Sequence, residues 1–283
     1  MNILGQKRVP TLSDQQESWL LSELHDRAGI TVETPRGILD SYVEERMAVT
    51  GASNAEDYLL CFREGITSRA EWLALVDLLT VKETRFFRQA ESIACYSQYL
   101  QDLVVIEPPH ELNIWSVGCS TGQELYSLGM VAEDLLRETC PNVEWHGIGT
   151  DLSFAAVAKA QSGVYSDSEV ASLPEVIRTR HMAPAPFTGW KMSADILART
   201  HFFHSNLLHV CDTPFTDFNV IFCQNVLIYF DRDQQYWILD QLIERLRPGG
   251  LLILGAGEAI LWSSSQLERM SFKGATAFQK LEN

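Results

Sequence analysis

The sequence predicts an α/β fold, in which an open, mostly parallel sheet with helices on both faces follows a small all-helical domain. The first 80 residues combine helical apolar spacing with helix-capping residues. From residue 112 onward, short apolar runs alternate with helical patterns, which is typical of βαβ units. We therefore expect a helical bundle over 1–80 and an α/β domain over 81–283, with an inserted, partly β segment at about 165–199.

Four helices are predicted in the bundle, because the chain offers four groups of residues suited to starting one. These are overlapping capping boxes at Ser13, a first-turn Pro35, an N-cap Asn54 and a capping box from Ser68 to Glu71. Such a bundle serves either as scaffolding or as a module that docks on a partner, and composition does not choose between the two.

The stretch Leu112–Ser127 predicts a strand, a turn bracketed by Gly118 and Gly122, and the start of a helix. Ligands bind at the carboxyl end of such a strand, close to the N–H groups that open the helix. The turn is not a dinucleotide fingerprint, which needs a glycine at Ser120, and it is not a P-loop. Glu124 disfavours a phosphate and suits a ligand with hydroxyls or an ammonium group. A tight turn without a ligand is the alternative.

A second strand is predicted at Trp145–Thr150 and ends in Asp151, at the same edge of the sheet. A carboxylate there is suited to accept hydrogen bonds from ribose hydroxyls. The alternative is structural, because Asp151 and Ser153 also suit the cap of the next helix. The remaining strands are predicted at Thr200–Ser205, Asn219–Asn225, Leu251–Gly255 and Thr276–Leu281. A turn is predicted at Arg247–Gly250, directly before the third of these strands.

Composition narrows the class of protein. The formal net charge of −15 disfavours nucleic acid or an anionic membrane as a partner. No apolar run approaches the roughly 20 residues that span a bilayer, and no signal peptide opens the chain. The six cysteines form no C-x-x-C pair and are expected to be reduced thiols in the cytoplasm. No metal site is expected, since the histidines lack ligand spacing.

Several motifs resemble those of a known family. The Leu-Arg-Pro-Gly-Gly-Leu-Leu segment at 246–252 is similar to a turn of S-adenosylmethionine-dependent methyltransferases with the Rossmann-like, class I fold. The narrower resemblance is to the CheR-type chemoreceptor glutamate methyltransferases of bacterial chemotaxis and type IV pilus motility. Four blocks between about 80 and 280 carry it: Thr84–Arg88, Trp115–Ser127, Gly149–Asp151 followed by Ala160–Tyr165, and Asn225–Phe230.

The resemblance implies roles for individual residues. Glu124 and Asp151 are expected to hold the amino-acid part and the ribose of S-adenosylmethionine, in a turn that includes Gly118. Thr84 and Arg88 are expected to close over the methionine end, with Arg88 near the methyl group. The remaining implied contacts are Lys82 with the cofactor, Asn206 and Leu207 with adenine, Asn225 and Val226 beneath the sulfonium, and Tyr229 with the acceptor.

The chain departs from the family pattern at four positions. Lys82 stands where the family usually has Asn, Gln224 stands where it has Arg, and Gln123 and Leu125 replace Glu and Pro. The inserted segment is shorter than in members that dock on a receptor's C-terminal pentapeptide. We therefore do not expect that tether here.

The resemblance implies methyl transfer from S-adenosylmethionine to glutamate side chains in the cytoplasmic helical domain of a chemoreceptor, without membrane insertion. A glutamate has an ordinary pKa near 4.3, so it is already a nucleophile at neutral pH and needs no general base. Arg88 could orient this carboxylate and Tyr229 could donate one more hydrogen bond. Two alternatives stay open: a methyltransferase for another acceptor, and a non-catalytic protein that senses S-adenosylmethionine and binds receptors.

Overall fold

The structure is a computed structural model that describes residues 11–29, 31, 35–62, 66–80, 83–106, 108–186, 189–258 and 262–282. The chain separates into two compact units, Met1–Val81 and Lys82–Asn283. Each unit is described by itself below.

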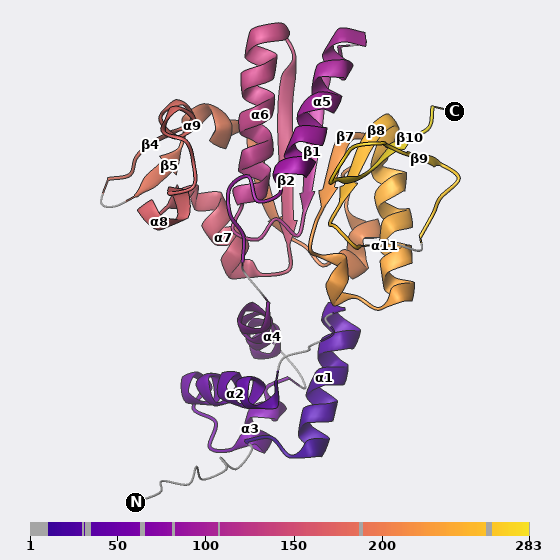
Figure 1. The fold of residues 1–283 in the computed structure, drawn as a ribbon. Coiled ribbons are helices and arrows are strands. Elements are labelled where there is room, and N and C mark those ends of the chain that lie inside the picture. The colour runs from indigo at the N-terminus through magenta and orange to yellow at the C-terminus, as the bar shows by residue number, and fades with distance from the viewer. Residues whose placement is uncertain are drawn as a thin grey trace, which may run out of the picture. The chain divides into compact units, whose positions relative to one another are not determined.

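The described part of the first unit is helical (Figure 1), as the sequence predicts. Ser13 and Gln16 form a reciprocal capping box at the start of the first helix, and the side chain of Asn54 caps the third. The elements are α1 (Asp14–Ala28), α2 (Arg36–Thr50), α3 (Ala55–Leu60) and α4 (Ile66–Leu79).

The prediction that Ser68 caps the fourth helix is wrong, because α4 begins at Ile66 and Ser68 lies inside it. The Ser68 hydroxyl donates to the carbonyl of Phe62 at 3.2 Å. Glu71 is also not a capping residue. Its buried carboxylate accepts two hydrogen bonds from Arg46, both at 2.8 Å, and one from the Tyr58 hydroxyl at 2.8 Å. Burying a carboxylate is favourable only when it is paired in this way.

The second unit is built on a seven-stranded sheet in the order β6-β2-β1-β7-β8-β10-β9. The first five strands in that order are parallel, and β10 and β9 each run antiparallel to their neighbour. This arrangement confirms the predicted open, mostly parallel sheet. The strands are β1 (Glu111–Val117), β2 (Glu144–Asp151), β6 (Thr200–His204), β7 (Phe218–Cys223), β8 (Leu246–Leu254), β9 (Leu267–Arg269) and β10 (Thr276–Lys280).

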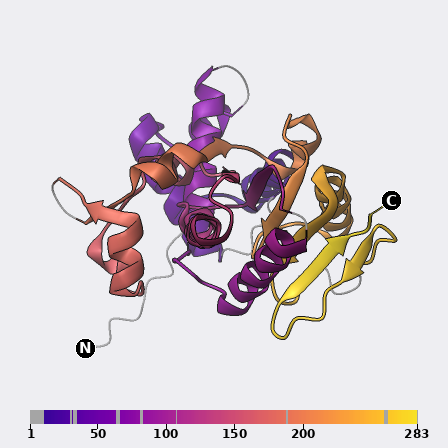
Figure 2. The same ribbon diagram turned by 90° about the horizontal axis from the view of Figure 1, so that it is seen from above.

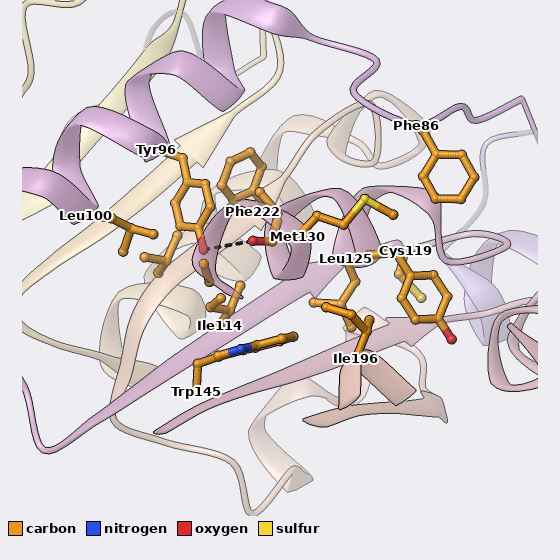
Figure 3. Packing of buried hydrophobic residues seen from close by; sticks show 14 of the residues in the cluster. Phe86, Tyr96, Leu100, Ile114, Cys119, Leu125, Met130, Trp145, Ile196 and Phe222 are labelled. Carbon is orange, nitrogen blue, oxygen red and sulfur yellow. Dashed lines mark hydrogen bonds between the residues drawn. The ribbon is translucent and has the colours of Figure 1, made fainter. Parts of the chain in front are cut away.

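Helices cover both faces of the sheet. On one face, α5 (Ala90–Ile106) and α6 (Gln123–Thr139) pack over Ile114, and α5 lies along β8 and β10 (Figure 2). On the other face, α11 (Arg232–Arg245) packs over Trp115 and Val117. Alternation along β1 therefore sends successive side chains into two separate cores. Figure 3 shows part of the first core, where Tyr96 of α5 also donates its hydroxyl to the Leu128 carbonyl at 3.2 Å.

The predicted Arg247–Gly250 turn lies inside strand β8. Phe218 pairs with Leu246, but two residues later Val220 pairs with Leu251, so the register shifts at this point. Gly249 accommodates the irregularity with a φ of 73°, in the left-handed region that favours glycine.

The predicted partly β insertion forms a second, three-stranded sheet in the order β3-β5-β4, at one side of the unit (Figure 1). Arg178 stacks over the Trp190 ring at 4.5 Å in this segment. Between β2 and β6 the chain forms α7 (Phe154–Ser162), β3 (Val164–Tyr165), α8 (Asp167–Val170), α9 (Glu175–His181), β4 (Met182–Pro184), β5 (Trp190–Met192) and α10 (Ala194–Arg199).

Two short 3-10 helices, η1 (Leu207–Asp212) and η2 (Leu227–Tyr229), follow the ends of β6 and β7. Among the residues described, no helix combines the length and apolar character needed to cross a membrane.

Candidate active site

The turn after β1 is shaped by three residues with positive φ: Gly118 at 67°, Ser120 at 49° and Gly122 at 95°. A Cβ at Gly118 would lie 2.2 Å from Cγ2 of Val226, so only a glycine fits there. This close approach joins the end of β1 to the turn after β7. The turn thus exposes backbone at the carboxyl edge of the sheet, where ligands bind in this class of fold.

Asp151, at the end of β2, holds the same turn from the other side. Its Oδ2 accepts the N–H of Ser120 at 2.7 Å, and its Oδ1 accepts the N–H of Ser153 at 2.8 Å. Ser153 itself is the N-cap of α7, and its side chain accepts the N–H of Ala156. Asp151 therefore has the structural role that the sequence left open. This does not exclude ribose binding, because a carboxylate offers about four acceptor positions.

Glu124 lies in the first turn of α6, and its Oε1 accepts the Ser116 hydroxyl at 2.8 Å. Burial raises the pKa of Glu124 to about 7. The negative charge of Glu258 adds to the rise in pKa, whereas the Ser116 bond and the positive charge of Arg88 oppose it. A cation placed beside a carboxylate in such an environment stabilises its ionised form.

The Thr84–Arg88 segment is fixed to the second unit by its two phenylalanines. Phe86 is 2% exposed and packs edge-on against Tyr165, with ring centroids 5.0 Å apart. Phe87 has a φ of 52°, and its N–H donates to the Ser127 hydroxyl at 3.0 Å. A non-glycine residue in this region stores strain, which is common at functional sites. The anchoring leaves Arg88 exposed, with its Nη1 donating to the Glu83 carbonyl at 2.7 Å.

The turn after β7 contains two of the predicted site residues, Asn225 and Tyr229, and both interact with residues of other segments. Asn225 has a φ of 59°, and its Oδ1 accepts a bond from Gln89 at 3.1 Å. Tyr229 is half-buried, and burial raises its pKa. The charge of Arg88 lowers the pKa of Tyr229, while those of Asp151 and Glu258 raise it. The ends of β1, β2 and β7 and the segment at Arg88 therefore meet at the carboxyl edge of the sheet.

The structure adds two residues that the sequence analysis missed. Ser116 is the hydrogen-bond partner of Glu124. Glu258, 5% exposed, accepts four backbone N–H groups from the loops after β7 and β8. Glu258 could have been predicted from the sequence as a site residue, because it is an acidic residue just after an apolar strand, as Asp151 is. Ser116 could not have been, since a lone serine within a buried strand does not by itself indicate a binding site.

Gln224, where the resembled family has Arg, is buried and makes internal hydrogen bonds. Its Nε2 donates to the Ser92 hydroxyl at 2.7 Å and to the Leu254 carbonyl at 3.3 Å. Gln224 therefore links the end of β7 to α5 without the positive charge that an arginine would place there.

The other predicted contact residues are peripheral or not described. Asn206 caps η1, and its side chain accepts the N–H of Leu208 at 3.0 Å. It lies beside Asp151, whose carbonyl accepts the N–H of Ser205 at 2.9 Å. Leu207 and Thr84 are partly buried. Lys82 lies outside the described residues.

These side chains fit S-adenosylmethionine by their chemistry. The partly buried Glu124 suits a cationic group, Asp151 suits hydroxyls, and the Gly118 backbone permits close approach. The sheet order with its antiparallel β10, together with these acidic strand ends, defines a class I S-adenosylmethionine-dependent methyltransferase.

Comparison with known proteins agrees with this class and narrows it. Residues 82–276 match the family described as "CheR methyltransferase, SAM binding domain", and the chain belongs to this family. The chain is 30% identical over 272 residues to the chemotaxis protein methyltransferase of Escherichia coli, which covers 94% of this chain and 91% of the relative. It is 29% identical to the Klebsiella aerogenes protein of the same name, over 96% of this chain and 91% of the relative.

Proposed function

We propose that this methyltransferase transfers the methyl group to glutamate side chains in the cytoplasmic helical domain of a bacterial chemoreceptor, forming methyl esters for sensory adaptation. The names of the relatives support a role in chemotaxis, and they match over nearly their full length. The feature that supports a carboxylate acceptor is the presence of two donor side chains, Arg88 and Tyr229, at this end of the sheet. The positive charge of Arg88 acts on the phenol and lowers its pKa, and a guanidinium and a hydroxyl can each donate a hydrogen bond to a carboxylate.

The proposed cofactor contacts are those that the sequence predicts. Glu124 holds the amino-acid part, Asp151 the ribose and Asn206 with Leu207 the adenine side. Asn225 and Val226 lie beneath the sulfonium, and Thr84 and Arg88 close over the methionine end. Gly118 and Lys82 complete the proposed contacts with the cofactor. The contacts of Gly118 with Val226 and of Ser120 with Asp151 support this assignment, since they join the ends of β1, β2 and β7 at the edge of the sheet where ligands bind in this class of fold.

When bound, S-adenosylmethionine supplies a methyl group on a positively charged sulfur. The residues of this chain then have a positioning task, because the acceptor carboxylate is ionised at neutral pH and needs no base. Arg88 orients the acceptor carboxylate and Tyr229 donates one hydrogen bond to it. Holding the reacting groups in line and away from water lowers the barrier. A single strong donor is preferable to several, because each bond also makes the carboxylate less nucleophilic.

The domain division belongs to the same proposal. The methyltransferase domain spans 81–283, and the helical domain at 1–80 is either a scaffold or a docking module. The protein acts in the cytoplasm, where the receptor's helical domain lies, and it does not use a pentapeptide tether.

Incubation with S-adenosylmethionine labelled in the methyl group and a purified receptor cytoplasmic fragment tests the proposal. We expect label on the fragment that is released as methanol by mild base, which is the signature of a glutamyl ester. Base-stable label would indicate a different acceptor. Binding of the fragment without label would indicate a receptor-binding protein without turnover. Arg88→Ala serves as the matched low-activity control.

A further inference from the structure

The carboxylate of Glu258 lies in a loop after β8 and is enclosed by backbone N–H groups. Oε2 accepts the N–H of Gly255 at 2.7 Å and that of Asn225 at 3.1 Å. Oε1 accepts the N–H of Val226 at 3.0 Å and that of Leu227 at 2.9 Å. Three consecutive residues after β7 thus point their N–H groups at one internal anion.

The conformation of these residues explains the arrangement. Asn225 is left-handed, with a φ of 59°, and Val226 is right-handed, with φ −116° and ψ −44°. Consecutive residues of opposite hand turn their N–H groups to the same side and form an anion-binding nest. In this protein the anion is supplied by the chain itself. A Cβ at Gly255 would lie 2.2 Å from Oε2 of Glu258, so a larger residue there would displace the carboxylate from the nest.

A direct contact between Glu258 and the cofactor does not fit these bonds. An ionised carboxylate has about four acceptor positions, and four N–H groups occupy them. The side chain is also only 5% exposed. Glu258 therefore acts through the residues that it holds.

Those residues belong to the cofactor site. The side chain of Val226 packs against Gly118, since its Cγ2 lies 2.2 Å from the position of an added Cβ there. The side chain of Asn225 is oriented by Gln89. A shift of the nest would move Val226 away from the β1 turn and Asn225 away from Gln89, the residue before α5.

We propose that Glu258 is a positioning residue for the cofactor site, whose carboxylate holds the Asn225–Leu227 turn in the conformation that binds S-adenosylmethionine. This inference rests on the placement of the cofactor proposed above. It adds a residue from the loop after β8 that contacts neither cofactor nor acceptor.

The principal test is the affinity for S-adenosylhomocysteine, measured by calorimetry on Glu258→Gln. An amide keeps one acceptor oxygen but turns an NH2 group toward the other two N–H groups, so half of the nest is left unpaired. We expect Kd for S-adenosylhomocysteine and KM for S-adenosylmethionine to rise by about tenfold or more. The kcat should fall by a smaller factor. Glu258→Ala, which removes all four bonds, should weaken binding at least as much.

Glu133→Gln is the matched control. Glu133 is a partly buried carboxylate on α6 that pairs with Arg137 and accepts the indole N–H of Trp145 at 2.8 Å. Trp145 lies at the start of β2, away from the carboxyl ends of the strands. We expect this variant to change Tm while Kd stays within about twofold. If Glu258→Gln is folded by circular dichroism, has a lower Tm and keeps the wild-type Kd, Glu258 is only structural and the proposal is wrong.

Hydrogen exchange on the unaltered protein tests the proposal even if the Glu258 variants do not fold. We expect the amides of Val226 and Leu227 to exchange slowly and to slow further when S-adenosylhomocysteine binds. Exchange as fast as in an open turn, or no response to the ligand, would overturn the inference. If the wild-type protein binds S-adenosylhomocysteine and Asp151→Ala binds it with the same Kd, the proposed placement of the cofactor is wrong. That result differs from a failure of the Glu258 inference, in which Asp151→Ala weakens binding and Glu258→Gln does not.

Discussion

Asp151 has a structural role at the sheet edge, and we propose that it also binds the ribose. Its two oxygens join the β1 turn to the start of α7 through Ser120 and Ser153. The same carboxylate lies at the sheet edge where ribose hydroxyls are expected. The choice that the sequence poses, between a structural residue and a binding residue, is therefore not an exclusive one.

Asp151→Ala should weaken S-adenosylhomocysteine binding, because it removes the ribose acceptor and releases the N–H of Ser120. We expect Kd to rise by about tenfold or more in calorimetry. Ser153→Ala, which removes the α7 cap but keeps the backbone N–H that Asp151 accepts, is the control and should lower stability by about 1 kcal/mol with little change in Kd. An unchanged affinity in Asp151→Ala would refute the ribose role.

Arg88→Ala should lower methyl transfer by about 100-fold or more, because orienting the acceptor contributes a large part of the rate. The fold should survive, since Arg88 is exposed and its described contact is a single backbone carbonyl. Arg88→Lys keeps the charge but not the paired donors, and it should recover only part of the rate. Wild-type turnover in Arg88→Ala would remove this residue from the site.

At the scale of elements, the site is made where three strand ends meet. The end of β1 contacts the turn after β7 through Gly118 and Val226, and it contacts the end of β2 through Ser120 and Asp151. The segment before α5 joins them through Phe87 and Ser127. In each link a backbone group meets a side chain, and the residues that supply the backbone, Gly118, Ser120 and Phe87, all have positive φ.

Gly118→Ala should disrupt this junction, because an added methyl group would overlap Val226 and alanine is disfavoured at a φ of 67°. We expect a stability loss of about 2 kcal/mol or more in denaturant unfolding, with weaker S-adenosylhomocysteine binding. Adding Val226→Ala makes room for the methyl group, so the double variant should regain part of the stability. If the double variant is as unstable as the sum of the singles, the overlap is not the cause.

At the scale of the whole molecule, the partly buried carboxyl of Glu124 links the site to stability. Folding raises the pKa of Glu124 from 4.5 to about 7, mainly through burial. Between these pH values the folded state therefore binds more protons than the unfolded state. The contribution of Glu124 to the free energy of unfolding falls as pH rises through this range, and it stays low above pH 7.

Glu124→Gln should remove this dependence in the protein without cofactor. The variant should gain stability relative to wild type as pH rises from 4.5 to 8, by at most about 3 kcal/mol. Urea unfolding at several pH values measures the difference. Parallel stability curves for the two proteins would contradict the assignment. Binding of S-adenosylhomocysteine should also weaken below pH 7 in wild type and lose that dependence in Glu124→Gln.

The sequence by itself determined the order of the main helices and strands and the mostly parallel sheet, and the resemblance of four motifs indicated the family. The helices and strands follow from apolar period and caps, which are local along the chain. The failures were also local in kind: Ser68 matched a capping box, but α4 begins before it, and Arg247–Gly250 matched a turn but continues β8.

Tertiary structure alone decided which groups meet. Ser116 pairs with Glu124, Glu258 fills the nest after β7, and Gln224 turns inward to Ser92. These contacts join residues from separate elements, and no spacing rule encodes them. Their physical basis is burial, because a polar group removed from water must find its hydrogen-bond partner wherever the packed chain places one.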